Sequence, residues 1–402
     1  MILRRRTVLA AGSAMLFTPA IVRAEETPGV TSTEIRLGNT IPYSGPASAY
    51  GTIGKAIAAA FREANDAGGF AGRKVKFISY DDGYSPPKTV EQVRRLIEED
   101  HVAAMFAPLG TPTNSATVRY VNAKKVPDLF LATGADKWGD YKKHPWVIGW
   151  QPSYVTEAQV YAKYIQTHKP NAKIGILYQN DDFGKDYLHG VRDVLKGNYD
   201  KQVTSVSYET TDATVDSQLV SLQSAKIDVL MTVAVPKFAA QSIRKVAEMN
   251  WKPMHILSGV SVSVGAVMIP AGPENGIGII SSAYLKDSTD PRWDNDAGMK
   301  QWRAFMAKYY PDGDIKDGGN ISAYGLTRTM VQVLKQCGND FSRQNMMKQA
   351  TNLRNLDNPV LLPGIRINTS PTNYHPLRQL QLMQWTGKTW NLFGDIISGA
   401  SA

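Results

Sequence analysis

The sequence predicts an α/β protein of two lobes, each built on a mostly parallel sheet. Short apolar runs alternate with segments in which apolar residues recur at helical spacing, and this alternation begins again after residue 150. Consecutive strand–helix–strand units favour a parallel sheet with helices on both faces, because crossover connections are right-handed. With 402 residues, the chain is also long enough for two domains.

Residues 1–24 read as an export signal. Arg residues at 4–6 form a charged start, Val8 to Val22 is mostly apolar or small, and Ala24 offers a small-residue cleavage site before Glu25. A membrane anchor is disfavoured, because Pro19 breaks a stretch that is already short for a span. The basic start also fits a twin-arginine pattern loosely, so both the Sec and the twin-arginine routes stay open.

The first half of the chain gives four buried strands and at least two helices. Ile53, Ile57 and Phe61 fall on one helical face, and Val93 and Ile97 on another. The strands are expected at Ile35–Ile41, Val75–Tyr80, Val102–Phe106 and Leu129–Leu131.

The second half repeats the pattern after the run Trp146–Trp150. Helices are expected at Val155–His168, Lys185–Lys196 and Lys237–Met249, and strands at Ile174–Tyr178, Val203–Tyr208, Ile227–Val233 and Met254–Leu257. The C-terminal third is less regular. It predicts helices at Met299–Tyr309, Ile321–Gln336 and Ser342–Thr351, which should pack on the first lobe, and strands around Ile365–Ile367 and Leu377–Trp385, which could return to the second.

Composition and motifs argue against several function classes. The net charge is +9, but Lys and Arg are scattered rather than gathered into the stripe that nucleic acid binding needs. Cys337 is the only cysteine, so no disulfide within the chain is expected, and the six histidines never pair at metal-ligand spacing. The stretches "GVSVSVG" at 259–265, "GIGIIS" at 276–281 and "DGDIKDGG" at 312–319 depart from the nucleophile-elbow, dinucleotide and calcium patterns. Neither an enzyme nor a metal or cofactor site is predicted.

The polar turns that follow the strands are the positive signal. In open α/β sheets, ligands bind beyond the carboxyl ends of the strands, where helix N-termini favour negative charge. Any single Ser, Thr or Gly in such a turn is more typical of a helix cap, so the case depends on several turns occurring together. They are "PYSGPASAYG" (42–51), "PLGTPTNSA" (108–116), "LATGADKWG" (131–139), "YQNDDFGKDY" (178–187), "AVPKFA" (234–239) and "SGVSVSVG" (258–265).

The export signal, the stretch "IRLGNTIPYSGPASAYGTIGKAIAAAFREANDAGGFAGRKVKFISYDDGYSP" and the motif "FGKDY" together resemble the branched-chain amino-acid-type (leucine-binding-protein-like) solute-binding proteins of ABC importers. The likeness extends from about Ile35 to the final strands. It implies a type I periplasmic binding protein, in which two Rossmann-like lobes are joined by a three-segment hinge. The implied division is 30–150 plus 284–360 for lobe 1 and 151–283 plus 361–402 for lobe 2, with crossings near Gly149–Tyr154, Ile280–Leu285 and Val360–Ile367.

The same resemblance implies the ligand-binding residues. An aromatic of the first turn enters the cleft, the next turns hold a ligand carboxylate, and the second lobe adds an aromatic and two further turns. Carried over to this chain, these are Tyr50, Gly110, Thr111, Thr113, Gly134, Ala135, Asp136, Asp182, Phe183, Val235, Pro236 and Gly259.

One departure from the family pattern bears on the ligand. Amino-acid binders of this family usually place a carboxylate in the turn that matches Ser258–Val264, yet no Asp or Glu occurs between Met249 and Glu274. A buried ammonium without a counter-charge is costly, so either Asp136, Asp181 or Asp182 replaces the acid or the ligand has no ammonium. The second option predicts that desamino carboxylic acids or neutral amides bind at least as well as amino acids.

The sequence therefore predicts a monomeric, periplasmic solute-binding component of an ABC importer, which closes on an amino acid, an aromatic or aliphatic carboxylate, or an amide, and docks on a membrane permease. Two alternatives stay open at this point. A ligand-binding subunit of a sensory system would use the same cleft, and a secreted hydrolase would need a nucleophile–base pair that the sequence does not show.

Overall fold

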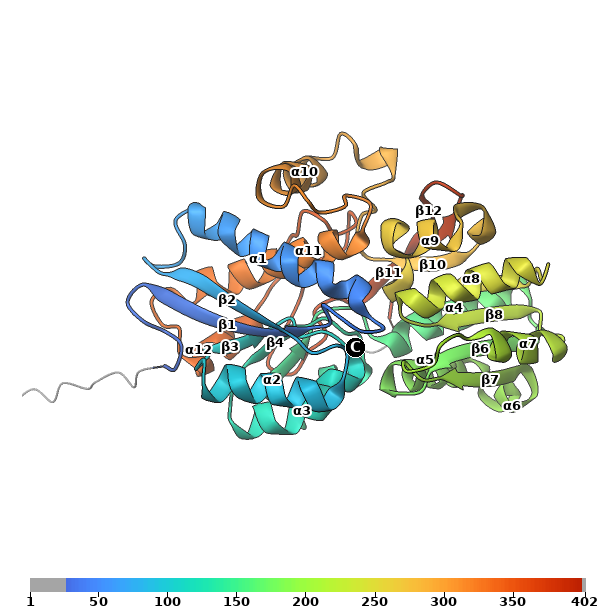
Figure 1. The fold of residues 1–402 in the computed structure, drawn as a ribbon, viewed down its shortest axis with the longest axis horizontal. Coiled ribbons are helices and arrows are strands. Elements are labelled where there is room, and N and C mark those ends of the chain that lie inside the picture. The colour runs from blue at the N-terminus through green and yellow to red at the C-terminus, as the bar shows by residue number, and fades with distance from the viewer. Residues whose placement is uncertain (1–26, 400–402) are drawn as a thin grey trace, which may run out of the picture.

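The computed structural model describes residues 27–399, so the predicted export signal at 1–24 lies outside the described residues. Within that range, no helix is both long and apolar enough to cross a membrane. The chain forms two α/β lobes side by side, one around a five-stranded sheet and one around a seven-stranded sheet (Figure 1).

The first sheet has the order β2-β1-β3-β4-β5, and all its strands are parallel. Its strands are β1 (Glu34–Ile41), β2 (Lys74–Asp81), β3 (Ala104–Phe106), β4 (Asp128–Leu131) and β5 (Val147–Gly149), and its helices are α1 (Gly51–Asp66), α2 (Pro86–Glu98) and α3 (Thr111–Ala123). The predicted strands and the first two helices are confirmed. Helix α3 was not predicted because Pro112 and the Thr, Ser and Asn residues around it disfavour helix interiors. Pro112 nevertheless lies in the first turn of the helix, where proline is well tolerated.

The second sheet has the order β12-β11-β10-β9-β8-β6-β7. Strands β6 to β10 are parallel, whereas β11 and β12 extend the sheet antiparallel at one edge. The strands are β6 (Ile174–Gln179), β7 (Val203–Tyr208), β8 (Val229–Val233), β9 (Met254–Leu257), β10 (Ile280–Ala283), β11 (Gln379–Trp385) and β12 (Trp390–Ser398). The helices of this lobe are α4 (Tyr154–His168), α5 (Asp182–Leu195), α6 (Tyr199–Gln202), α7 (Asp216–Ser224), α8 (Pro236–Glu248) and the short α9 (Ile269–Ala271).

The C-terminal helices belong with the first lobe, as predicted. They are α10 (Ala297–Tyr309), α11 (Gly318–Gln336) and α12 (Arg343–Ala350), and α11 lies against α1 (Figure 1). The predicted strand at 365–367 is wrong, because Ile367 forms only an isolated bridge with Leu356. Strands β10 and β12 were not foreseen; β10 is short, and the alternation of β12 is interrupted by Gly394 and Asp395.

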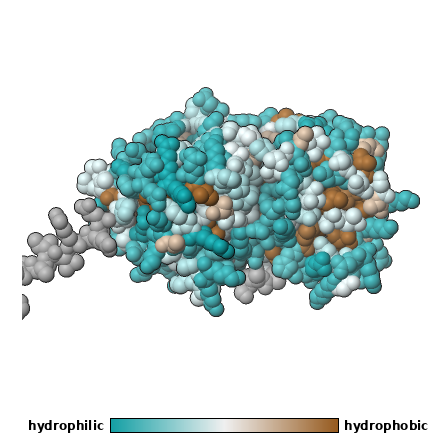
Figure 2. Space-filling model, turned by 60° about the horizontal axis from the view of Figure 1, so that its bottom comes forward, coloured by the Kyte–Doolittle hydropathy of each residue, from teal (hydrophilic) through white to brown (hydrophobic). Residues whose placement is uncertain are grey.

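The chain passes between the sheets three times: after β5, after β10, and again before β11. The residue-by-residue division into lobes stays a prediction. Apolar side chains fill the space between each sheet and its helices, with Phe106, Phe130 and Phe238 fully buried. The outer surface is largely hydrophilic over the lobe of the first sheet, and apolar residues gather on the other lobe in the face shown in Figure 2.

Candidate binding cavity

A cavity of about 1180 Å³, including space that opens to solvent, lies between the two lobes. Leu109, Gly110 and Ala132 contribute to its wall from the carboxyl ends of first-sheet strands, and Val235 and Gly259 do so from second-sheet strands. This is the edge at which parallel α/β sheets bind ligands. The predicted residues that line the cavity are Tyr50, Gly110, Thr111, Phe183, Val235, Pro236 and Gly259.

Thr111 and Gly110 form the N-terminus of α3 at the cavity wall. Gly110 has a φ of 102°, and a Cβ at this position would lie 2.5 Å from the ring of Tyr84, so the turn requires glycine. The Thr111 hydroxyl is buried and lies 2.6 Å from the Thr133 hydroxyl, an arrangement in which either oxygen can donate. A helix N-terminus with a hydroxyl beside it suits a carboxylate.

Aromatic side chains from both lobes surround the cavity. The Tyr50 hydroxyl donates to the Val260 carbonyl across the cleft at 3.0 Å. Phe183 packs against Tyr154 with ring centroids 4.8 Å apart, and both rings belong to the wall. Such walls suit a ligand with an apolar or flat body.

Thr113, Gly134 and Ala135 do not line the cavity. The Thr113 hydroxyl turns back and donates to the Leu109 and Gly110 carbonyls, so its hydrogen bonds stay within its own turn. Gly134 lies beneath Tyr154, since a Cβ there would come within 2.8 Å of that ring, and Ala135 is buried in the core.

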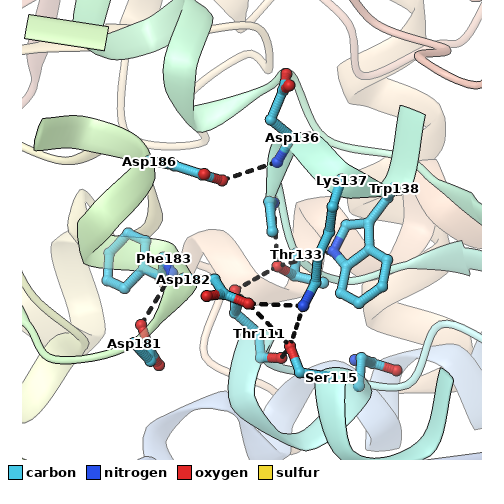
Figure 3. Close-up of polar contacts among 12 residues, drawn as sticks. Thr111, Ser115, Thr133, Asp136, Lys137, Trp138, Asp181, Asp182, Phe183 and Asp186 are labelled. Atoms are coloured by element: carbon cyan, nitrogen blue, oxygen red, sulfur yellow. Dashed lines mark hydrogen bonds and ion pairs between the residues drawn. The ribbon is translucent and has the colours of Figure 1, made fainter. Parts of the chain in front are cut away.

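Asp136 and Asp182 also lie outside the cavity, at a contact between the lobes (Figure 3). Asp182 pairs with Lys137 at 2.7 Å, and the hydrogen bond from Lys137 lowers the pKa of this carboxyl. The Asp136 carboxyl accepts a hydrogen bond from Ser153 at 2.5 Å.

The third acid that the sequence analysis considered, Asp181, is likewise engaged. It caps α5 by accepting the backbone N–H groups of Phe183 and Gly184 (Figure 3). All three acids proposed to meet a ligand ammonium from these turns are therefore occupied with capping or inter-lobe contacts. Asp181 and Asp182 come shortly after β6, where α5 begins, and Asp136 begins the 3-10 helix Asp136–Gly139, so the turns place these acids at cap or contact positions.

Several residues of the cavity wall were not predicted from the sequence. Tyr84 and Tyr154 are 6% and 5% exposed, and both line the cavity. Gln151, Ser282 and Tyr284 come from the segments where the chain crosses between lobes. Tyr154 ends the predicted crossing Gly149–Tyr154, and an aromatic residue at that position is a signal that could have pointed to it. The other wall residues come close to the cavity only through the fold.

The charged groups of the wall are mainly acidic. Asp287 and Asp317 line the cavity, and burial raises the pKa of both carboxyls. Lys286 also belongs to the wall, but its ammonium bonds to Asp296 at 2.7 Å and to the Pro359 carbonyl at 2.9 Å. Across residues 27–399, no group of three His, Cys, Asp or Glu side chains comes together in a way that could hold a metal ion.

Known proteins resemble this chain over nearly its whole length. The sequence profile of the periplasmic binding protein family matches residues 34–389. A Leu/Ile/Val-binding protein homolog 7 of Brucella suis is 22% identical over 376 residues, which cover 90% of this chain and 92% of the relative.

Two solved structures show the same fold. One is a branched chain amino acid ABC transporter protein from Thermus thermophilus with bound valine, at a TM-score of 0.81 and 14% identity, with 92% of this chain and 98% of that chain covered. The other is a fatty acid ABC transporter substrate-binding protein from Thermomonospora curvata, at a TM-score of 0.78 and 20% identity, with 94% and 95% covered. The chain belongs to the periplasmic binding protein family and has the type I fold of its leucine-binding-protein-like members.

Proposed function

We propose that this protein is the extracytoplasmic solute-binding component of an ABC importer and binds a small amino acid or a related organic carboxylate between its lobes. The observation that carries the proposal is the cavity itself, which combines apolar and aromatic walls with the N-terminus of α3. Small-molecule sites usually have a few polar groups among many apolar ones.

Contacts across the cleft support a role that involves opening and closing. Tyr50 bonds to Val260, Lys137 pairs with Asp182, and the Ser263 hydroxyl donates to Asp317 at 2.9 Å. These contacts hold the lobes together beside the cavity, so we propose that a solute enters and leaves when the lobes separate. Three crossing segments provide a hinge for this motion.

The relatives support the same role without fixing the ligand. Of the two similar solved structures, one holds bound valine and the other is a substrate-binding protein of a fatty acid ABC transporter. For this chain we therefore propose a carboxylate held at Thr111, with a body that contacts Tyr50 and Phe183. We further propose that the mature, monomeric protein begins at Glu25 after export and delivers its solute to a membrane permease.

A ligand screen tests the proposal. The mature chain, purified without refolding, is first weighed by native mass spectrometry and then heated with a panel of amino acids, desamino carboxylic acids, amides and fatty acids. A ligand present at 100 times its Kd should raise the free energy of unfolding by about 2.7 kcal/mol and hence the Tm. The proposal is wrong if no small carboxylate or amide stabilises the protein at millimolar concentration and no ligand is retained on purification. The identified ligand then allows the transport role to be tested, because cells that lack this protein should lose its uptake.

A further inference from the structure

The buried acid Glu157 lies directly behind the cavity wall. It projects from α4 and is 5% exposed. One of its oxygens, Oε1, accepts hydrogen bonds from the Tyr161 hydroxyl at 2.5 Å, the Gly259 N–H at 2.7 Å and the Ser282 hydroxyl at 3.1 Å. Three donors on one oxygen favour a carboxylate that accepts rather than an acid that donates.

Two of those donors belong to residues that line the cavity, namely Gly259 and Ser282. A Cβ at Gly259 would lie 2.8 Å from Oε1 of Glu157, so only glycine lets the carboxyl lie against this turn. Tyr154, one helical turn before Glu157, also lines the cavity. The carboxyl is therefore one residue layer away from a bound solute.

When it is ionised, this carboxyl has no basic partner within the described part of the chain. No Lys, Arg or His forms an ion pair with Glu157 among residues 27–399. Asp287 and Asp317 add two carboxyls to the wall, and the ammonium of Lys286 is held by Asp296. A buried charge without a partner is costly, so a cationic group placed in the cavity would offset that cost.

We propose that the cavity selects a ligand that bears an ammonium group, and that Glu157 is the positioning residue that supplies the negative charge through Gly259 and Ser282. The inference rests on the function proposed above and specifies its ligand as an amino acid or another aminated carboxylate. Desamino ligands were predicted from the sequence because the turn at Ser258–Val264 contains no acid. The acid that reaches this turn is 102 residues earlier in the chain.

Matched ligand pairs test the inference. Leucine is compared with 4-methylpentanoate, and phenylalanine with 3-phenylpropanoate, by calorimetry on the mature chain. Wild-type protein should bind the member with the ammonium at least about tenfold more tightly. The variant Glu157→Gln keeps the size and an acceptor oxygen but loses the charge, and its preference should fall about tenfold, while its affinity for the desamino member stays the same or improves.

The pH dependence of ligand affinity gives a second readout, because a residue with a purely structural role would not affect it. Burial raises the pKa of Glu157, and a ligand cation favours the ionised form, so binding of the amino acid releases a proton as the pH approaches that pKa. Affinity for the ammonium-bearing member should therefore weaken as the pH falls, in the wild type but not in Glu157→Gln. The desamino member should show no such weakening from this source.

Asp128→Asn is the control, because Asp128 is a buried acid in β4 that does not line the cavity. It should leave the ligand preference unchanged. Asp317→Asn tests whether an acid of the wall itself sets the preference for the ammonium-bearing ligand. If Asp317→Asn abolishes this preference while Glu157→Gln retains it, the assignment to Glu157 is overturned.

The outcomes also separate this inference from the proposed function. Desamino acids that bind wild-type protein as tightly as their amino partners overturn the inference and leave the function standing. Failure of both members of every pair, together with failure of the wider screen, overturns the function. Should Glu157→Gln not fold, the pair comparison and the pH series on wild-type protein still decide the ligand class.

Discussion

Glycines next to tyrosines shape the cavity at the scale of single residues. Gly110 lies under the ring of Tyr84, and Gly134 under the ring of Tyr154. Neither tyrosine could occupy its place if the turn carried a side chain. These glycines thus position wall residues rather than contact a solute through side chains of their own.

Gly134→Ala should therefore be destabilising. The new methyl would lie 2.4 Å from the Pro152 carbonyl oxygen and 2.8 Å from the Tyr154 ring, and backbone cannot move away as a flexible side chain can. We expect a loss of about 1–3 kcal/mol in the free energy of unfolding and weaker ligand binding, because Tyr154 must shift. Thermal unfolding and calorimetry measure both. Gly197→Ala is the control, as nothing lies within 4 Å of a Cβ there; equal melting temperatures for the two variants would refute the packing argument.

Thr111 offers a test of the carboxylate site. Thr111→Val removes a buried hydroxyl at the start of α3 and leaves the Thr133 hydroxyl without this partner. If Thr111 donates to the ligand, affinity should fall by about 1–3 kcal/mol. Thr113→Val removes a hydroxyl from the same helix that bonds only to backbone carbonyls, so it should lower stability and spare affinity. A Thr111→Val protein with wild-type affinity would mean that the Thr111 hydroxyl serves only its contact with Thr133.

At the scale of elements, α3, α5 and the short 3-10 helix Asp136–Gly139 meet across the cleft. The Lys137 ammonium bonds to Asp182 at 2.7 Å and to Ser115 at 2.5 Å, and the Asp136 N–H donates to Asp186 at 2.8 Å (Figure 3). Ser115 lies in the same lobe as Lys137, but the bonds from Lys137 to Asp182 and from Asp136 to Asp186 connect the two lobes and must break when these separate. They should therefore slow ligand release.

Lys137→Met should raise the rate of ligand dissociation. Lys137 and Asp182 are 30% and 48% exposed, so the pair contributes about 0.2–1 kcal/mol to the closed state. Stopped-flow displacement measures the rate, and added salt should raise it in the wild type more than in the variant, because salt screens the pair. Lys88→Met removes an ion pair of similar exposure within one lobe, between Lys88 and Asp81, and should leave dissociation unchanged. Equal rates for wild type and Lys137→Met would show that the contact does not hold the lobes together.

The whole molecule contains buried ionisable groups whose effects on stability oppose each other. Burial raises the pKa of Asp128 to about 7 and that of Asp186 to about 7, and it lowers the pKa of His255 to about 4. Between about pH 4 and pH 7 the folded state holds the Asp protons and the unfolded state does not, so these acids reduce stability as the pH rises. His255 acts in the other direction, because the unfolded chain takes up its proton below about pH 6.5.

Asp128→Asn isolates one of these groups. The variant should be more stable than the wild type at pH 8, by up to about 4 kcal/mol for a pKa raised from about 3.9 to about 7, and the difference should vanish near pH 4. Denaturant unfolding at both pH values provides the measurement. A difference that is the same at pH 4 and pH 8 would show that Asp128 does not keep its proton in the folded state.

At every scale, the features that could be predicted from the sequence were those marked by a pattern of neighbouring residues. Four of the five strands of the first sheet and Met254–Leu257 were predicted to within about two residues, because buried parallel strands are continuous apolar runs. Helix α3 was not predicted because Pro112 interrupts the helical pattern at its start. Strand β10 was not predicted because it is only four residues long. Tyr50, Thr111 and Phe183, which the family resemblance implied, line the cavity, where the carboxyl ends of the parallel strands meet.

The sequence by itself determined the α/β class, the two sheets and the turns that face the cleft, because periodicity and turn residues act over a few positions. Only the tertiary structure decided which acids lie in or directly behind the cavity wall. Asp136 and Asp182 lie in the expected turns but pair across the lobes, while Glu157 comes from a helix that begins after the first crossing and meets Gly259 through folding. Charge acts through space, so the counter-charge of a ligand can come from a part of the chain that no local pattern connects with the turn it serves.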